Sequence, residues 1–187
     1  MKIYLIRHAR TVWNDERRIQ GWADIEPYEE AKKIFLEKVR KIPDNPDVIF
    51  SSDLKRAIIS ANLIRQLHPN TPILLDWRLR ERNMGELEGK LYEGIREEFP
   101  ELWGTVDVAP PGGESILDMA ERLEKAVKDI LWFSEINGYK VVFVISHQLA
   151  IEVLRRILLK EPVDKTIWEN LIGSGDWIKL ELPIPSF

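Results

Sequence analysis

Short apolar segments alternate with amphipathic helical segments along most of this chain. Residues 2–6 and 48–50 are apolar runs of strand length, and residues 26–42 between them carry apolar side chains at helical spacing. A strand, a helix and a second strand in this order form a β-α-β unit with parallel strands. The alternation continues with helices predicted at 55–67, 115–133 and 149–159 and strands at 72–75 and 141–145. This pattern predicts an α/β fold.

Two other regions complete the expected organisation. Residues 177–182 alternate apolar and polar side chains before prolines end the pattern, which is typical of an edge strand. Residues 83–113 show only a short helical pattern, at about 92–101, so we expect an insertion over the edge of the sheet. A chain of 187 residues with 44% hydrophobic residues can bury one good core but is short for two. We therefore expect a single domain over residues 1–187.

Reactive side chains follow four of the predicted strands. Arg7 and His8 come directly after the first strand, and His147 follows the strand at 141–145. Arg56 and Glu81 lie shortly after two others. A lone histidine beside an apolar run is more often a core or surface residue than a catalyst. An open α/β sheet, however, places its ligand at the carboxyl ends of its strands, where all five side chains would meet. The set therefore predicts an active site.

These residue types suit transfer of a phosphoryl group. The guanidinium forks of Arg7 and Arg56 match the oxygens of a phosphate dianion. A neutral imidazole, from His8 or His147, can attack phosphorus. A protonated carboxyl group, such as that of Glu81, can give the leaving alkoxide its proton. The remaining cations can stabilise the charge on the phosphoryl oxygens, so this chemistry requires no metal ion.

Charge and composition exclude several other classes. The chain has 27 basic and 31 acidic residues and a net charge of −4, which argues against a partner that is a nucleic acid or a membrane surface. It has no cysteine, which rules out disulfides and thiolate chemistry. No signal peptide or long apolar span is visible, so we expect a cytoplasmic protein. The expected partner is a small phosphorylated metabolite; the oligomeric state stays open, with a homodimer as one option.

Five blocks of residues occur in an order that matches a known family. They are Arg7-His8-Ala9-Arg10-Thr11 with Asn14 and Gln20-Gly21, SSDLKRA at 51–57, LRE at 79–81 with GELEG at 85–89, PGGES at 111–115, and Ser146-His147. With these blocks the chain resembles the histidine phosphatase superfamily, the phosphoglycerate-mutase-like proteins, and within it the phosphatase branch. The blocks extend over nearly the whole chain, and their combination is far more specific than any one of them.

The resemblance implies a fold and a role for each residue. The fold would be a three-layer α-β-α sandwich with a mixed, mostly parallel sheet. His8 would be phosphorylated on a ring nitrogen, Glu81 would be the general acid and later the base, and His147 would complete the catalytic set. No cofactor and no metal would be needed. Further positions would bind phosphate (Arg7, Asn14, Arg56) or line the path to the leaving group (Gln20, Gly21).

Two positions depart from the family pattern. Ala9 replaces the usual glycine, which alanine can do if the backbone there has negative φ. Gln148 stands where glycine or asparagine is common, so its side chain either reaches the phosphate or narrows the pocket. The helix that begins there would offer free backbone amides to an anion, and we assign Gln148 to phosphate binding. Trp13 and Trp22 follow His8 and either line the pocket or cover the core.

Several other functions remain possible at this point. A mutase returns the phosphoryl group to the substrate, whereas a phosphatase transfers it to water. Sugar-acid mutases that resemble this family are longer, so the compact chain favours the phosphatase. A binding protein that keeps the phosphate pocket without catalysis is a third reading, favoured by Ala9 and Gln148. A metal hydrolase is less consistent with the sequence, which has no closely spaced pair of histidine ligands.

Overall fold

The computed structural model, described here for residues 1–183, contains a five-stranded sheet in the order β3-β2-β4-β1-β5. Strands β1 to β4 pair in parallel, and β5 runs antiparallel to β1 at one edge. The predicted mixed, mostly parallel sheet is thus confirmed. The strands are β1 (Lys2–Arg7), β2 (Val48–Ser51), β3 (Ile73–Leu75), β4 (Val141–Ser146) and β5 (Trp177–Glu181).

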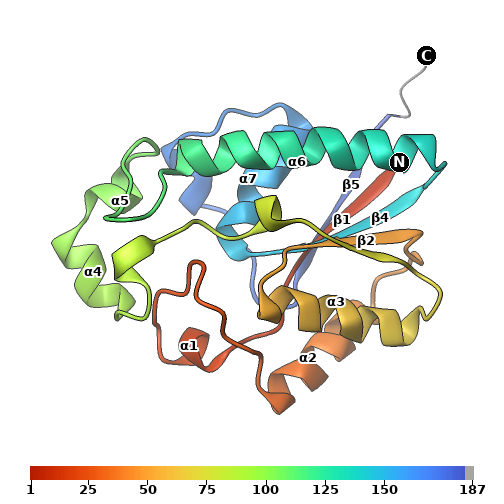
Figure 1. Ribbon diagram of the computed structural model, residues 1–187, viewed down its shortest axis with the longest axis horizontal. Helices are drawn as coiled ribbons and strands as arrows, with labels where there is room; N and C mark the ends of the chain where they lie inside the picture. The colour runs from red at the N-terminus through yellow and green to blue at the C-terminus, as the bar shows by residue number, and fades with distance from the viewer. Residues whose placement is uncertain (184–187) are drawn as a thin grey trace.

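Helices cover both faces of the sheet, as Figure 1 shows. Helices α2 (Glu29–Val39) and α3 (Lys55–Leu67) lie on one face, and α6 (Ile116–Ile136) and α7 (Gln148–Leu159) lie on the other. Side chains of β1 contribute to the hydrophobic cores on both faces of the sheet, because successive side chains of a strand point to opposite faces. Ile3 and Leu5 join the core under α6 and α7, whereas Tyr4 and Ile6 join the core under α2 and α3. The fold is therefore the expected three-layer sandwich.

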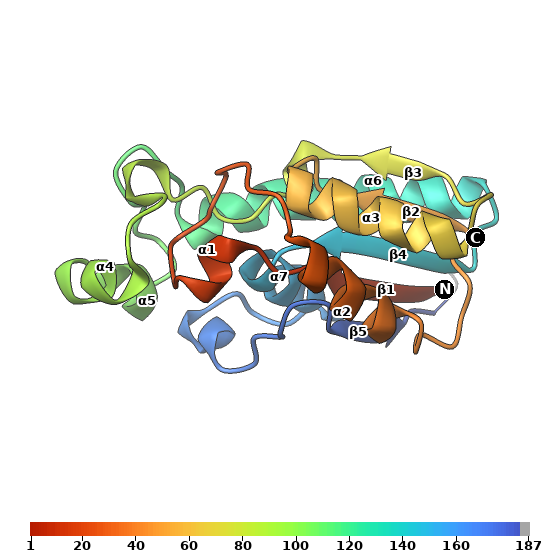
Figure 2. The same cartoon turned by 90° about the horizontal axis from the view of Figure 1, so that it is seen from below.

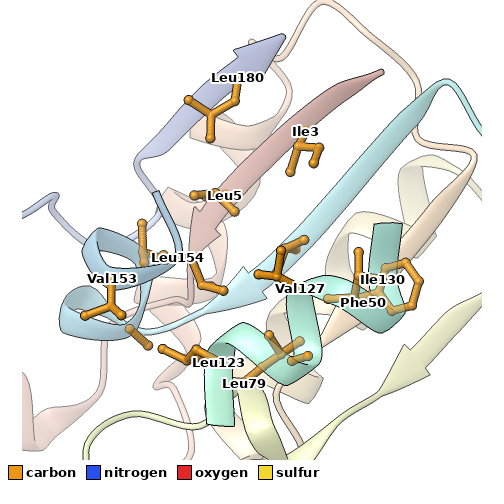
Figure 3. Close-up of a cluster of buried hydrophobic side chains, with 14 of the residues drawn as sticks. Ile3, Leu5, Phe50, Leu79, Leu123, Val127, Ile130, Val153, Leu154 and Leu180 are labelled. Carbon is orange, nitrogen blue, oxygen red and sulfur yellow. The ribbon is translucent and has the colours of Figure 1, made fainter. Parts of the chain in front are cut away.

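The larger core fixes the position of α6 and α7. Leu5 of β1, Val127 of α6 and Leu154 of α7 belong to one buried cluster (Figure 3). Full burial of one such side chain stabilises the fold by roughly 1.5–3 kcal/mol. Helix α6 begins at Ser115, whose hydroxyl accepts the backbone N–H of Asp118 while the Asp118 carboxylate accepts that of Ser115. This capping box satisfies N–H groups that otherwise have no partner in the first turn.

Residues 83–113 lie at the end of the molecule toward which the parallel strands point (Figure 2). They contain η2 (Gly85–Leu87), α4 (Tyr92–Glu98) and α5 (Glu101–Gly104). The helical stretch predicted at about 92–101 is confirmed over Tyr92–Glu98 but not beyond, since α4 ends before Pro100. A proline disfavours helical angles at the residue before it, and Phe99 has a φ of −126° and a ψ of 60°. A small cluster that includes Met84, Leu87 and Leu102 holds this segment together.

The remaining short elements are α1 (Val12–Asp15), η1 (Trp77–Leu79) and η3 (Lys165–Trp168). Among residues 1–183, no helix has the length and apolar character needed to cross a membrane.

Candidate active site

The register of β1 and β4 brings the two predicted histidines together. Arg7 pairs with Ser146 at the carboxyl ends of the strands, and the backbone N–H of His8 donates to the Ser146 carbonyl over 3.1 Å. His8 and His147 therefore leave the sheet side by side, with ring centroids 5.0 Å apart. Both side chains are buried.

His8 is held in the form that a nucleophile needs. Its Nδ1 lies 2.6 Å from the carbonyl oxygen of Ala9, which can only accept a hydrogen bond. In the neutral ring the proton therefore sits on Nδ1, and Nε2 keeps its lone pair. Ala9 does not adopt a positive φ, so alanine fits at the position where the family pattern has glycine.

The surroundings of both histidines keep the rings neutral. Burial holds the pKa of His8 well below 6.5, and the positive charges of Arg56 and Arg7 lower it further. The pKa of His147 is lowered in the same direction, first by burial and then by Arg56. Both rings are therefore neutral at neutral pH in the folded protein, each with a single N–H, and His8 keeps one nitrogen available as a base or nucleophile.

The two histidines should make the protein less stable in mild acid. On unfolding, their pKa returns toward about 6.5, and below that pH the unfolded chain binds protons that the folded protein does not. The free energy of unfolding should therefore fall from about pH 7.5 to about pH 5.5, and by less in His8→Gln, which has one such group fewer. Urea unfolding in phosphate-free buffer measures this difference. An identical loss in both proteins would mean that His8 titrates normally when folded.

One ring nitrogen of His147 has no hydrogen-bond partner among the described residues. Its Nε2 lies 2.8 Å from the hydroxyl oxygen of Ser52, which also accepts the backbone N–H of Leu54 over 3.3 Å. The Ser52 hydroxyl can therefore donate its hydrogen to Nε2, which leaves the ring proton on Nδ1. That nitrogen is buried and has no partner among the described residues.

Arg7 and Arg56 are each anchored by backbone carbonyl groups. Arg56 donates to Gly21 over 2.6 Å and to Ala23 over 2.7 Å, and Arg7 donates to Ile172 over 2.9 Å. Burial lowers the pKa of both guanidinium groups to about 10, so both stay charged at neutral pH. Their Nε atoms are buried without a partner in the described part of the chain.

Unsatisfied buried donors are rare in folded proteins and each calls for a physical explanation. Residues 1–183 contain six buried side-chain nitrogen or oxygen atoms with no hydrogen-bond partner. Three of them belong to the group around His8: Arg7 Nε, Arg56 Nε and His147 Nδ1. A fourth, Trp168 Nε1, belongs to a residue that lines the same pocket. The concentration of unused donors in one place indicates a site for an anion.

Glu81 lines the pocket and is fixed by backbone groups. Its carboxylate accepts the N–H groups of Arg82, Leu149 and Ala150 at 3.0–3.1 Å. Its own carbonyl accepts from the Trp22 indole and the Arg122 guanidinium. The expectation that the first amides of α7 are free for an anion is therefore corrected, because Glu81 occupies two of them. The result is a carboxyl group held firmly at the pocket.

The other predicted residues also line this pocket, and most have a structural partner as well. Thr11 donates its backbone N–H to the side-chain oxygen of Asn14 and its hydroxyl to that of Gln20. Gly21 has a φ of +51° and supplies a carbonyl to Arg56. Gln148 donates its side-chain amide to the Ile172 carbonyl over 3.1 Å. The pocket brings together eight of the nine predicted residues, with His147 directly behind His8.

Sequence reasoning missed the far wall of the pocket. Trp13 and Trp22, considered as wall residues, are not among its lining side chains. Trp22 lies behind Glu81, where it bonds to the Glu81 carbonyl and where the guanidinium of Arg80 stacks on its ring. The lining residues that were not predicted are Arg18, Ile19, Arg82, Met84, Tyr92, Trp103, Leu149 and Trp168.

Within residues 1–183, no group of three or more His, Asp or Glu side chains is placed to share a metal ion.

Comparison with known proteins agrees with this geometry. The model of the histidine phosphatase superfamily (branch 1) matches residues 3–182. The probable phosphoglycerate mutase GpmB of Escherichia fergusonii is 35% identical over 169 residues, which cover 87% of this chain and 76% of that protein. Mycobacterial hydrolase 1 has a TM-score of 0.85 at 26% identity, with 95% and 90% of the two chains covered. A mycobacterial glucosyl-3-phosphoglycerate phosphatase in complex with VO3 has a TM-score of 0.84 at 27% identity, with 96% and 92% covered.

Proposed function

The chain belongs to the histidine phosphatase superfamily, and on that premise we propose that it is a metal-independent phosphomonoesterase acting through a phosphohistidine on a small phosphorylated metabolite. One observation carries this proposal. The lone pair of His8 Nε2 is available in a pocket lined by Arg7 and Arg56, and the Nε atoms of these arginines and Nδ1 of the neighbouring His147 ring have no partner among residues 1–183. These are a nucleophile and three donors for the oxygens of one phosphoryl group.

In the first step, His8 Nε2 forms a bond to phosphorus while the bond from phosphorus to the ester oxygen breaks. The ester oxygen takes a proton from the Glu81 carboxyl group and leaves as an alcohol. Arg7, Arg56 and His147 stabilise the charge on the three remaining oxygens.

In the second step, water takes the place of the alcohol. Glu81, now a carboxylate, accepts a proton from the water as its oxygen bonds to phosphorus. The bond from phosphorus to His8 Nε2 breaks, and the electron pair returns to the ring. The products are inorganic phosphate, neutral His8 and protonated Glu81, so the enzyme is ready for another substrate.

The second candidate function is a phosphoglycerate-type phosphomutase. The relative of 35% identity, which is named a probable phosphoglycerate mutase, favours it. The phosphatase is favoured by two structural neighbours of 26–27% identity, one named a hydrolase and one a phosphatase. Both activities share the first step and differ in whether water or a substrate hydroxyl accepts the phosphoryl group.

Turnover should survive removal of metal ions. We expect a panel of phosphate monoesters, incubated with enzyme and excess EDTA, to release inorganic phosphate at nearly the rate seen without EDTA, because arginine and histidine supply the positive charge. Measuring free phosphate and isomerised ester in the same samples separates phosphatase from mutase. Complete loss in EDTA with recovery on adding a divalent ion would contradict the mechanism. Binding of phosphate without any turnover would leave only a binding protein.

A further inference from the structure

Three aromatic side chains form a continuous wall of the active-site pocket. The rings of Tyr92 and Trp103 meet edge to face with centroids 5.2 Å apart, and those of Trp103 and Trp168 lie 6.3 Å apart. All three line the pocket that contains His8, and all three are half-buried. Tyr92 begins α4, Trp103 lies in α5 and Trp168 ends η3, so the wall joins two segments that are distant in sequence.

The segment that carries Trp168 is firmly anchored. Arg156 of α7 donates to the carbonyl of Pro162 over 2.9 Å and to the carboxylate of Asp164 over 3.2 Å. Asp164 in turn caps η3 by accepting the backbone N–H of Thr166. Arg156 is itself held by the buried Glu152 at 2.8 Å. The wall is therefore formed before any substrate binds, which lowers the entropic cost of binding a flat group against it.

The pocket beyond the phosphate donors is mixed in character. Ile19, Met84 and Leu149 line it beside the aromatic wall, together with the polar side chains of Asn14, Gln20 and Gln148. The two further arginines there make most of their hydrogen bonds to the protein. Arg82 is buried, and its three guanidinium nitrogens donate hydrogen bonds to the carbonyls of Glu114, Leu102 and Val108. Arg18 donates to the carboxylate of Glu16 over 2.6 Å and to the carbonyl of Gly89 over 2.9 Å.

These contacts bear on the identity of the leaving group. A phosphorylated sugar acid carries a carboxylate, and a carboxylate removed from water is bound best by a cation with unused donors. The arginines beyond the phosphate site are largely satisfied by the protein itself. A flat apolar group, in contrast, would lose its contact with water and gain aromatic contacts on Trp103 and its neighbours.

We propose that the leaving group of the natural substrate is aromatic or flat and apolar, and that Trp103, flanked by Tyr92 and Trp168, selects it. This inference rests on the proposed phosphomonoesterase function and narrows it to a class of substrate.

The test compares esters whose leaving groups are all alkyl alcohols, so that differences in rate report on binding and not on the chemistry of departure. The probes are 2-phenylethyl phosphate, ethyl phosphate and 3-phosphoglycerate. We expect kcat/KM for 2-phenylethyl phosphate to exceed that for ethyl phosphate by about tenfold or more, because one aromatic contact with apolar burial reaches that size. We expect 3-phosphoglycerate to be no better than ethyl phosphate.

Variants of Trp103 then test whether the aromatic wall causes the preference for the phenylethyl ester. Trp103→Ala should lower kcat/KM for 2-phenylethyl phosphate by about tenfold and that for ethyl phosphate by less than about threefold. Trp103→Phe should restore most of the loss. The matched control is Trp132→Ala, which removes an exposed tryptophan on α6 outside this pocket and should change neither value. The ester series on the unaltered enzyme needs no variant, so misfolding of Trp103→Ala does not weaken the test.

The possible outcomes separate the inference from the function on which it rests. Equal kcat/KM for the phenylethyl and ethyl esters, or a preference for 3-phosphoglycerate, would overturn the aromatic leaving group while keeping the phosphatase. Equal losses on both alkyl esters in Trp103→Ala, with Trp103→Phe unable to rescue, would overturn the role of Trp103. Release of phosphate from none of the esters would overturn the proposed function itself.

Discussion

Replacing His8 with alanine should abolish turnover, with kcat lower by a factor on the order of 10⁴ or more, as expected for loss of a covalent nucleophile. The variant removes Nε2, the one ring nitrogen whose lone pair the Ala9 contact leaves available. Acid quenching of the unaltered enzyme with ³²P-labelled substrate should trap an acid-labile phosphohistidine. The same quench of His8→Ala should trap none.

The third histidine provides the control. His68 ends α3 and does not line the pocket, so His68→Ala should keep full activity and normal labelling. His147→Ala should lose activity, because a phosphate donor disappears, yet the label that it does trap should still map to His8. Label on residue 147 would exchange the roles of the two histidines. Unchanged turnover in His8→Ala would exclude the phosphohistidine mechanism.

The arginine charges in the pocket affect both phosphate binding and the protonation of His8. In the proposed mechanism Arg7 and Arg56 bind a dianion, and the same positive charges help to hold the pKa of His8 down. Burial, the larger contribution, acts in the same direction. The protein therefore keeps His8 neutral, so the proposed nucleophile needs no separate base to deprotonate it. When a phosphate dianion binds, it neutralises the arginine charge, and this repays part of the cost of burying two guanidinium groups.

The layered fold was predictable because each strand and helix carries a strong local signal. Apolar strands that end in a reactive residue, such as Ile6 before Arg7 and Ile145 before Ser146, are short and unambiguous. Once the strands are parallel and paired in register, the residues after them must meet at one edge. This geometric necessity explains why His8 and His147, far apart in sequence, were assigned to one site.

The aromatic wall was not predictable for the opposite reason. Trp103 and Trp168 lie in helical segments of four residues, which are too short to show periodicity. Their meeting depends on how residues 83–113 pack against η3, and that packing has no local signature. The amides of α7 illustrate the same limit. They were expected to bind a ligand anion, and two of them instead bind the carboxyl group of Glu81.

Glu81→Gln should separate two kinds of substrate. Without a proton donor, kcat/KM for ethyl phosphate, which reports the steps up to the phosphohistidine, should fall by about 10²-fold or more, because an alkoxide is a poor leaving group. For p-nitrophenyl phosphate, whose phenolate departs without a proton, kcat/KM should fall by less than about tenfold. The control is Glu86→Gln, since the Glu86 side chain is exposed and does not line the pocket.

The contacts of Glu81 decide how its variants must be interpreted. Glutamine keeps one oxygen acceptor but turns an NH₂ group toward a backbone N–H, so Glu81→Gln should also lose some thermal stability. A loss of stability alone lowers the rates on both substrates by the same factor, whereas loss of the acid lowers the rate on ethyl phosphate far more. Equal losses on both substrates would make Glu81 a residue that positions α7. An unchanged rate on both would remove it from the mechanism.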